Sequence, residues 1–165
     1  MTISDSIRSY GTVLPLAILR ILLGFMFLWA FLDKMFGLGY NTTSADAMIN
    51  GGSPTQGFLQ YGSETLSALG DFFAVTDVII MAAFLLLGVA LILGIGMKAA
   101  TIGGTLLLIM MYIGVFPPDT NPLIDYHIIY IFLLLAIYLA HAEDLLGLGK
   151  QWKEMEIVKK LPILE

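Results

Sequence analysis

The stretch that decides the fold is LPLAILRILLGFMFLWAFLDKMF, residues 14–36. It is long and apolar enough for a transmembrane helix, which needs about 20 such residues, yet it carries Arg20 near its start and Asp33 and Lys34 near its end. A cleavable signal peptide has a shorter apolar region followed by small residues, whereas this stretch stays apolar to Phe36. We therefore expect a retained membrane helix with charged side chains inside it.

Three more apolar stretches follow the first. We expect them to span the membrane as helices over residues 72–93, 99–116 and 122–142. Only residues 94–98 join the second stretch to the third, which predicts an antiparallel hairpin. Asn121 and Pro122 predict the N-cap and the first position of the fourth helix, because proline is favoured there. The fold class is therefore all-α, a four-helix bundle forming a single integral membrane domain.

The composition excludes several classes of protein. Of the 165 residues, 58% are hydrophobic and only 13% are charged, which is far from the composition of a soluble globular domain. The absence of cysteine rules out disulfides, thiolate metal sites and iron–sulfur clusters. A net charge of -5 argues against nucleic acid as a partner, and no phosphate-binding loop, dinucleotide fingerprint or HExxH motif is present.

The distribution of basic residues predicts the orientation in the membrane. Segments 37–71 and 117–124 contain no Lys or Arg. The basic residues outside the spans lie on the other side: Arg8, Lys98, Lys150, Lys153, Lys159 and Lys160. Because cytoplasmic loops are enriched in Lys and Arg, we expect both termini in the cytoplasm, with the protein in the cytoplasmic membrane. Residues 37–71 then form a long outer loop, and residues 143–165 form a tail on the inner membrane surface.

Five polar side chains are expected near the outer ends of the helices. Asp33 and Lys34 end the first helix, Asp77 lies one turn into the second, and Asp125 and His127 lie at the start of the fourth. Ionisable groups inside a bilayer are costly and mark functional sites by default. We expect these groups to meet in one layer, with His127 carrying protons and Asp33, Asp77 and Asp125 as its orienting or proton-accepting partners.

Two of the candidate residues allow a second interpretation. Arg20 lies in the inner half of the first helix, where it either binds an anion or a quinone oxygen, or extends towards the cytoplasmic headgroups or pairs with a carbonyl group. His127 either contacts quinone or only holds helices together by pairing with Asp33 or Asp77. It cannot share a haem iron with His141, which lies 14 residues later on the same helix. No bound metal or haem is expected.

Aromatic residues near the charged layer are candidates for a quinone-ring pocket. Trp29 precedes Asp33 by one turn, and Tyr126 precedes His127. Aromatic residues also serve as ordinary anchors at membrane interfaces, so this alternative stays open.

Short motifs occur in order along nearly the whole chain. They are FLWAFLDK (27–34), FGLGY (36–40), GGSPT (51–55), GFL (57–59), LGIGM (93–97), PP (117–118), NP (121–122), Asp125 with His127, and LGLG (146–149). This set resembles the DoxX/DoxD family of four-helix membrane proteins.

The resemblance implies a candidate reaction. Similar members are described as the large, DoxD-like subunit of thiosulfate:quinone oxidoreductase, which oxidises thiosulfate to tetrathionate and passes the electrons to membrane quinone. It implies a second oxidoreductase subunit as partner. From their positions in the first helix, we expect Lys34 and Arg20 to contact the anion or a quinone oxygen. Whether this chain is itself a thiosulfate dehydrogenase (quinone) subunit stays open, as does homo-oligomer formation. Other members are thought to be scaffolds or anchors for oxidoreductase or thiol and oxidative-stress complexes, which is the alternative function.

Thiosulfate is a dianion, and the charges of the outer segments do not favour it. These segments carry Asp46, Glu64, Asp71 and Asp119 and no Lys or Arg, so long-range steering would repel the substrate. Only Lys34 and, more deeply, Arg20 would hold it.

Overall fold

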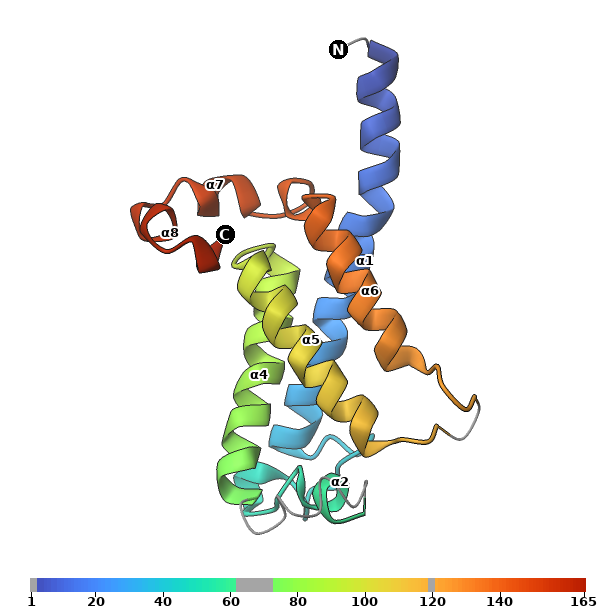
Figure 1. Cartoon of the computed structure of the whole chain (residues 1–165). Helices are drawn as coiled ribbons and strands as arrows, with labels where there is room; N and C mark the ends of the chain where they lie inside the picture. Colours follow the sequence, from blue (N-terminus) through green and yellow to red (C-terminus); the bar gives the residue numbers. More distant parts are fainter. Residues whose placement is uncertain (1–2, 62–72, 119–120) are drawn as a thin grey trace.

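The computed structural model describes residues 3–61, 73–118 and 121–165, and these residues form helices and loops without strands. Four helices make the bundle: α1 (Ile3–Phe36), α4 (Phe73–Leu93), α5 (Met97–Gly114) and α6 (Tyr126–Leu139). In Figure 1, α4 lies beside α1, and α5 lies beside α4 and α6. We call the end of the bundle that carries residues 37–61 the loop end, and the opposite end, which carries residues 140–165, the tail end.

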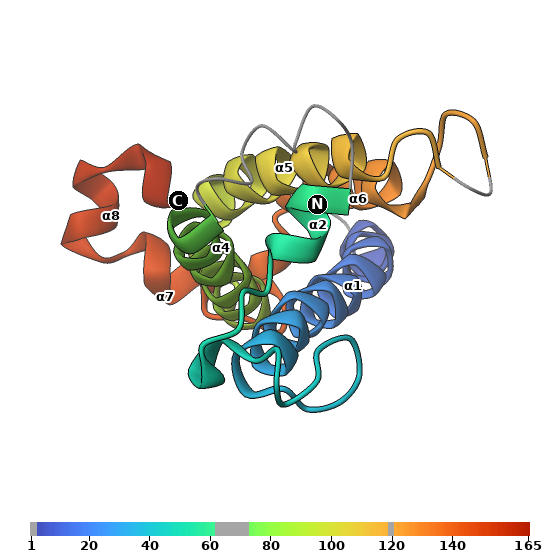
Figure 2. The ribbon, with the colours of Figure 1, turned by 90° about the horizontal axis from the view of Figure 1, so that it is seen from below.

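Short helices cover both ends of the bundle. At the loop end, η1 (Met48–Asn50) and α2 (Gln56–Tyr61) follow α1, and α2 lies across the end of the bundle (Figure 2). At the tail end, the chain continues through η3 (Ala142–Asp144), α7 (Gly149–Lys153), α8 (Glu156–Lys160) and η4 (Pro162–Leu164). This C-terminal segment extends to one side of the bundle (Figure 1).

Glycines allow the backbones of α1 and α4 to approach closely. A Cβ atom on Gly88 would lie 2.7 Å from the backbone nitrogen of Leu28, and one on Gly24 would lie 2.8 Å from that of Ile92. Small residues allow such contacts in membrane proteins, where hydrophobicity does not drive helices together. The core between the helices is apolar and includes the fully buried Leu91.

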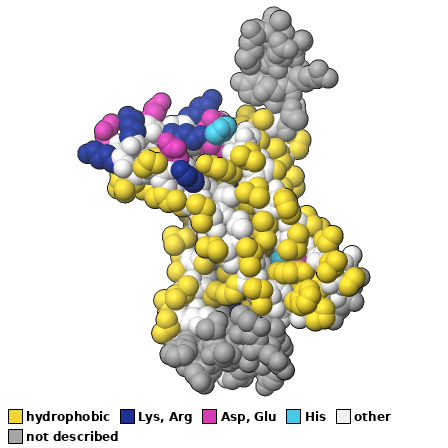
Figure 3. Space-filling view, in the orientation of Figure 1, with side chains coloured by type: hydrophobic (Ala, Val, Ile, Leu, Met, Phe, Trp, Pro, Cys, Tyr) yellow, Lys and Arg dark blue, Asp and Glu magenta, His cyan; other side chains and the backbone are white. Residues whose placement is uncertain are grey.

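Three helices are long and apolar enough to cross a membrane: Val13–Phe36, Ala74–Leu93 and Met97–Gly114. Large apolar side chains cover the outside of the bundle (Figure 3), and Leu86 and Phe132 are 68% and 67% exposed. Such a surface is stable in contact with lipid rather than with water. The chain is therefore a multi-pass integral membrane protein in contact with the lipid bilayer.

The predicted helix positions agree with the structure for three stretches and differ for the fourth. The predicted spans 14–36, 72–93 and 99–116 correspond to the three long helices, although residue 72 lies outside the described residues and α1 itself begins at Ile3. The fourth stretch, 122–142, is helical only over Tyr126–Leu139. This helix of 14 residues is about 21 Å long, shorter than a hydrocarbon core of about 30 Å.

The predicted start of the fourth helix is wrong. Asn121 accepts hydrogen bonds from the amides of Leu123 and Ile124 and so closes a turn before the helix. Asp125 is the N-cap, because its carboxylate accepts from the amides of His127 and Ile128. Asn and Asp are both good N-cap residues, so the residue type alone does not distinguish the two positions.

Candidate functional site

Asp33 holds the first turn of the loop onto the end of α1. Its side chain is 2% exposed and accepts hydrogen bonds from the backbone amides of Tyr40, at 3.2 Å, and Asn41, at 2.9 Å. The chain reverses at Gly37, whose φ of 63° favours glycine. Asp33 therefore accepts from two backbone donors of the loop and is itself satisfied in its buried position.

Asp77 holds the next part of the loop onto α4. Its carboxylate is 5% exposed and accepts two hydrogen bonds from Thr55, one from the amide at 2.9 Å and one from the hydroxyl at 2.6 Å. Asp33 and Asp77 thus fasten two places in the loop to two different helices.

Lys34 lies close enough to both carboxylates to feel their charge and is half-buried. The negative charges of Asp33 and Asp77 both act on it. Its amine makes no hydrogen bond or ion pair with the residues that the structure describes. Between Arg20 and Lys98, Lys34 is the only basic residue in the sequence. It is therefore the one available cation at the loop end of the described structure.

An apolar cavity of about 330 Å³ lies between α1, α4 and α5 and reaches Lys34. Its polar wall consists of Asp33, Lys34 and Asn41. The other lining residues are apolar: Met26, Phe27, Trp29, Ala30, Phe84, Leu108 and Met111. The ring of Trp29 is held edge-on against Tyr40, with the ring centroids 5.1 Å apart. An apolar cavity with a few polar groups at one end is the usual form of a small-molecule site, and this volume is at the small end of the common range of about 300–1,000 Å³.

A second cavity, of about 390 Å³, lies in the loop and also includes Lys34 in its wall. The rest of its lining is mostly polar: Asn41, Thr42, Asp46, Ser53, Pro54, Gln56 and Gly57. The Ser53 hydroxyl is buried and has no hydrogen-bond partner among the described residues. Lys34 and Asn41 therefore separate an apolar cavity in the helices from a polar cavity in the loop.

His127 and Asp125 form a separate pair at the start of α6. His127 is 1% exposed, and its Nδ1 lies 2.5 Å from a carboxylate oxygen of Asp125. An imidazole that donates from Nδ1 carries its lone pair at Nε2. The Nε2 atom of His127 is buried and has no partner within the described part of the chain. This carboxylate–imidazole arrangement orients the ring and leaves Nε2 without a partner, so in the neutral imidazole that donates from Nδ1 this nitrogen can accept a proton.

The single polar layer predicted from the sequence is thus divided into two groups. Asp33, Lys34 and Asp77 lie together beneath the loop, whereas His127 pairs with Asp125 and not with Asp33 or Asp77. Of the predicted quinone contacts, Trp29 and Lys34 line the same cavity. Tyr126 instead packs on the ring of His127, at a centroid distance of 4.1 Å, and is 55% exposed.

Arg20 lies at the tail end and binds backbone carbonyl groups. It is fully buried, and its Nη1 and Nη2 atoms each donate a 2.7 Å hydrogen bond, to the carbonyls of Leu91 and Leu146. Longer bonds reach the carbonyls of Ile92, at 3.2 Å, and Leu145, at 3.4 Å. The carbonyl-pairing alternative therefore describes this residue, and Arg20 is distant in the fold from the predicted site at the loop end.

Glycines from two of the sequence motifs make room for the Arg20 guanidinium. A Cβ atom on Gly94 would lie 2.5 Å from Nη1, and one on Gly147 would lie 3.0 Å from Nη2. Any side chain at either position would displace the arginine or the backbone. The LGIG and LGLG motifs are therefore part of the Arg20 binding site.

Glu143 is a buried charge that the sequence analysis missed. It is 2% exposed, its charge acts on Arg20, and its carboxylate lies 2.7 Å from the Nζ atom of Lys153. Partial burial lowers the pKa of Lys153, but hydrogen bonds and the charges of Glu143 and Asp144 outweigh this effect and raise that pKa above its ordinary value. The sequence feature that could have indicated this role is the acidic pair Glu143 and Asp144. It directly follows the last apolar stretch, at the same side of the membrane as Arg20.

Some of the expected features fall outside the part of the chain that the structure describes. The acidic residues Glu64, Asp71 and Asp119, and the part of the outer loop over 62–71, lie outside the described residues. Within the described ranges, no group of three or more His, Asp or Glu side chains is arranged to hold a metal ion.

Comparisons with protein-family models, curated proteins and solved structures found no match to this chain.

Proposed function

We propose that this chain is the membrane subunit of a quinone-linked oxidoreductase, and that its electron donor is thiosulfate. The observation that carries the proposal is the apolar cavity beside Trp29 that ends at the unpaired amine of Lys34. Two thiosulfate ions give tetrathionate and two electrons, and these electrons together with two protons reduce the quinone to quinol.

Lys34 and Trp29 are the proposed contacts of the quinone head group. The ring lies in the apolar part of the cavity beside Trp29, and the amine of Lys34 donates a hydrogen bond to one carbonyl oxygen. A positive charge at this oxygen stabilises the negative charge that develops during reduction. His127, oriented by Asp125, is the proposed proton carrier, because its Nε2 is free to accept a proton.

The polar cavity on the other side of Lys34 is the proposed approach for the hydrophilic donor. Its wall contains the Ser53 hydroxyl, which lacks a partner among the described residues, and the Asn41 side chain. Because Lys34 is the only Lys or Arg at this end, binding of a dianion requires further cationic groups. We propose that a second oxidoreductase subunit supplies them.

The proposed topology has the loop end outside and the tail end in the cytoplasm, in the cytoplasmic membrane. The basic residues of the tail support this orientation. In this topology α6 is the fourth crossing, and its short length requires local thinning of the bilayer.

Tryptophan fluorescence tests the quinone site directly. The chain has two tryptophans, Trp29 in the cavity and Trp152 in α7 at the tail end. In the Trp152→Phe variant, a short-chain quinone should quench the fluorescence of Trp29 in a saturable manner. In the Trp29→Phe variant, quenching of Trp152 should stay linear with quinone concentration. Equal, unsaturable quenching of both tryptophans would contradict a quinone site beside Trp29.

Activity is the second test. Membranes that contain the chain together with its partner subunit should reduce an added quinone anaerobically when thiosulfate is supplied. Lys34→Met should weaken saturable quenching and remove turnover, whereas His127→Gln should remove turnover while saturable quenching remains. Turnover that both variants retain would exclude these roles.

A scaffold function is the second candidate, and a specific observation favours it. Asp33, Asp77 and Arg20 all use their hydrogen bonds to hold loops and helix ends in place. In this function the chain anchors an oxidoreductase or a thiol or oxidative-stress complex without reacting itself. Asp33→Ala would then reduce the yield of the co-purified complex, and Lys34→Met would leave the specific activity of that complex unchanged.

A further inference from the structure

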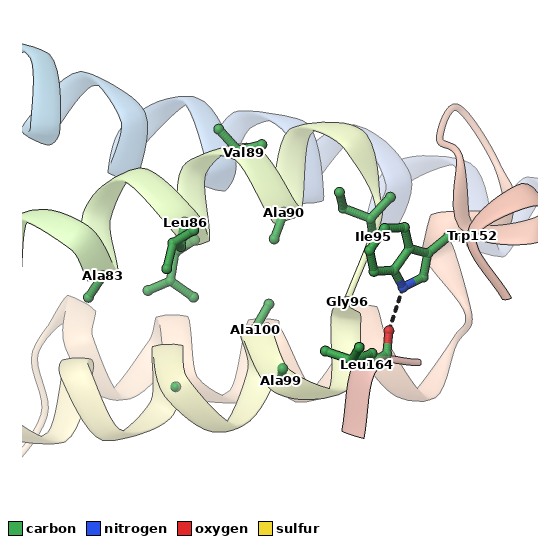
Figure 4. A pocket seen from close by; sticks show the side chains of 12 residues that line it. Ala83, Leu86, Val89, Ala90, Ile95, Gly96, Ala99, Ala100, Trp152 and Leu164 are labelled. Carbon is green, nitrogen blue, oxygen red and sulfur yellow. Dashed lines mark hydrogen bonds between the residues drawn. The ribbon is translucent and has the colours of Figure 1, made fainter. Parts of the chain in front are cut away.

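A third cavity lies at the opposite end of the bundle, in a groove between α4 and α5. Its volume is about 430 Å³, and no charged side chain lines it. Figure 4 shows Ala83 and Ala90 on the α4 side and Ala99 on the α5 side, with Trp152 and Leu164 at the end of the groove. The lining offers hydrocarbon contacts, so the groove suits an apolar occupant.

The groove exists because small side chains lie on one face of α5. A Cβ atom on Gly103 would meet nothing within 4 Å, whereas one on the next residue, Gly104, would lie 2.8 Å from Leu134. The face of α5 that carries Gly104 thus packs tightly on α6, whereas the face that carries Gly103 is open. Atoms that line an unfilled space lose dispersion contacts, so occupation by a matching chain is favourable.

The C-terminal segment closes the tail end of the groove. The indole of Trp152 donates a hydrogen bond to the backbone carbonyl of Leu164, and the amide of Lys98 donates to the carbonyl of Glu165 at 2.6 Å. Charged side chains gather over this segment (Figure 3), while Trp152 and Leu164 line the groove. A segment with one polar and one apolar side is stable at the depth of lipid headgroups.

A cation is available beside the groove. Lys98 lies in the first turn of α5, between the lining residues Gly96 and Ala99, and is half-buried. Its amine makes no hydrogen bond or ion pair with the described residues. The backbone amide of Lys98 contacts the backbone oxygen of Glu165, and no ion pair joins these two described residues.

We infer that the groove is a binding site for an anionic phospholipid of the leaflet that adjoins the tail end. One acyl chain lies along Ala90, Ala99 and Gly103, and the phosphate lies beside Lys98. This inference is independent of the proposed quinone site, which lies at the loop end.

Photo-crosslinking tests the site. The full chain is placed in phosphatidylcholine nanodiscs that contain a small fraction of phosphatidylglycerol with a diazirine in one acyl chain, and the labelled residues are mapped by mass spectrometry. Labelling should concentrate on residues 83–103. It should exceed labelling of the exposed α1 face at Leu22 and Phe25, which are 57% and 55% exposed and line none of the three cavities described above.

Gly103→Leu should fill the groove and reduce its labelling to the level of the α1 face. The substitution places a better helix former in open space, so the helix is retained. The matched control is Ile102→Phe, which adds bulk on a neighbouring exposed face of α5 and should leave labelling unchanged.

Lys98→Gln should reduce labelling by the phosphatidylglycerol probe to that of a phosphatidylcholine probe. Equal labelling by the two probes in the unmodified chain would contradict recognition of an anionic headgroup. Labelling spread evenly over all exposed faces, or unchanged in Gly103→Leu, would overturn the site. A dimer of the unmodified chain that becomes monomeric in Gly103→Leu, with no lipid label on residues 83–103, would overturn it in favour of a second copy.

Discussion

Replacing Arg20 with methionine should destabilise the protein strongly without touching the proposed quinone site. The side chain is fully buried and donates hydrogen bonds of 2.7 Å to the carbonyls of Leu91 and Leu146. At about 1.5–3 kcal/mol for each bond from a charged donor, these two bonds alone correspond to about 3–6 kcal/mol. Glu143 also loses the positive charge that compensates its burial.

The assay is thermal unfolding of the detergent-solubilised protein, followed by circular dichroism. For a chain of this size, the loss corresponds to a fall in Tm of roughly 6–24 °C. Arg20→Lys should give an intermediate fall, because a single ammonium group cannot reach all four carbonyls. Leu22→Met is the control, since Leu22 is exposed on the same helix.

An Arg20→Met variant as stable as the control would refute this reasoning. If that variant kept its Tm but lost quinone reduction, Arg20 would be a ligand-binding residue, which is the alternative that its position in the sequence also allows.

Two further predictions concern the ends of the bundle. Asp77→Ala should lower the free energy of unfolding by about 1–3 kcal/mol, because two buried donors of Thr55 lose their acceptor. In Asp77→Ala, hydrogen exchange at the Thr55 amide should also accelerate, and in Asp77→Asn it should accelerate less. Unchanged exchange in both variants would contradict the contact between Thr55 and Asp77. For Lys153 the folded pKa is raised, so its stabilisation is complete below the ordinary lysine pKa of about 10.4 and is lost as the pH rises through the folded value. The difference in unfolding free energy between wild type and Lys153→Met should therefore stay constant from neutral pH to about pH 10 and shrink above that pH. A difference that already shrinks near neutral pH would show that this ion pair is not its source.

The long helices were predictable because the bilayer imposes a length and a composition on them. The loop end of α1 at Phe36 and the tail end of α4 at Leu93 agree with the prediction, since glycine follows both. Hydropathy identifies only the part of a helix that lies in lipid. It therefore could not predict that α1 begins at Ile3. The choice between Asn121 and Asp125 as N-cap depended on tertiary contacts.

The candidate site was predictable as a set of residues but not as a geometry. Charge inside an apolar stretch identified Asp33, Lys34 and His127, and the structure puts Lys34 beside Trp29 in one cavity. The partners of Asp33 and Arg20 were not predictable, because they are backbone groups, which every residue carries. Glu143 looked like part of a surface tail because its burial depends on a fold that the local sequence does not encode.

The bonds of Arg20 also have a consequence for biosynthesis. Its acceptors at Leu145 and Leu146 lie 125 and 126 residues later in the chain. At a synthesis rate of about 5–20 residues per second, the ribosome adds them roughly 6–25 s after the arginine. During this interval the guanidinium of Arg20 in the first helix lacks its two acceptors at Leu145 and Leu146. A chain interrupted before Leu145 therefore keeps the acceptors of Nη1 at Leu91 and Ile92 but leaves Nη2 without its own, which makes an incomplete chain less stable than the full one.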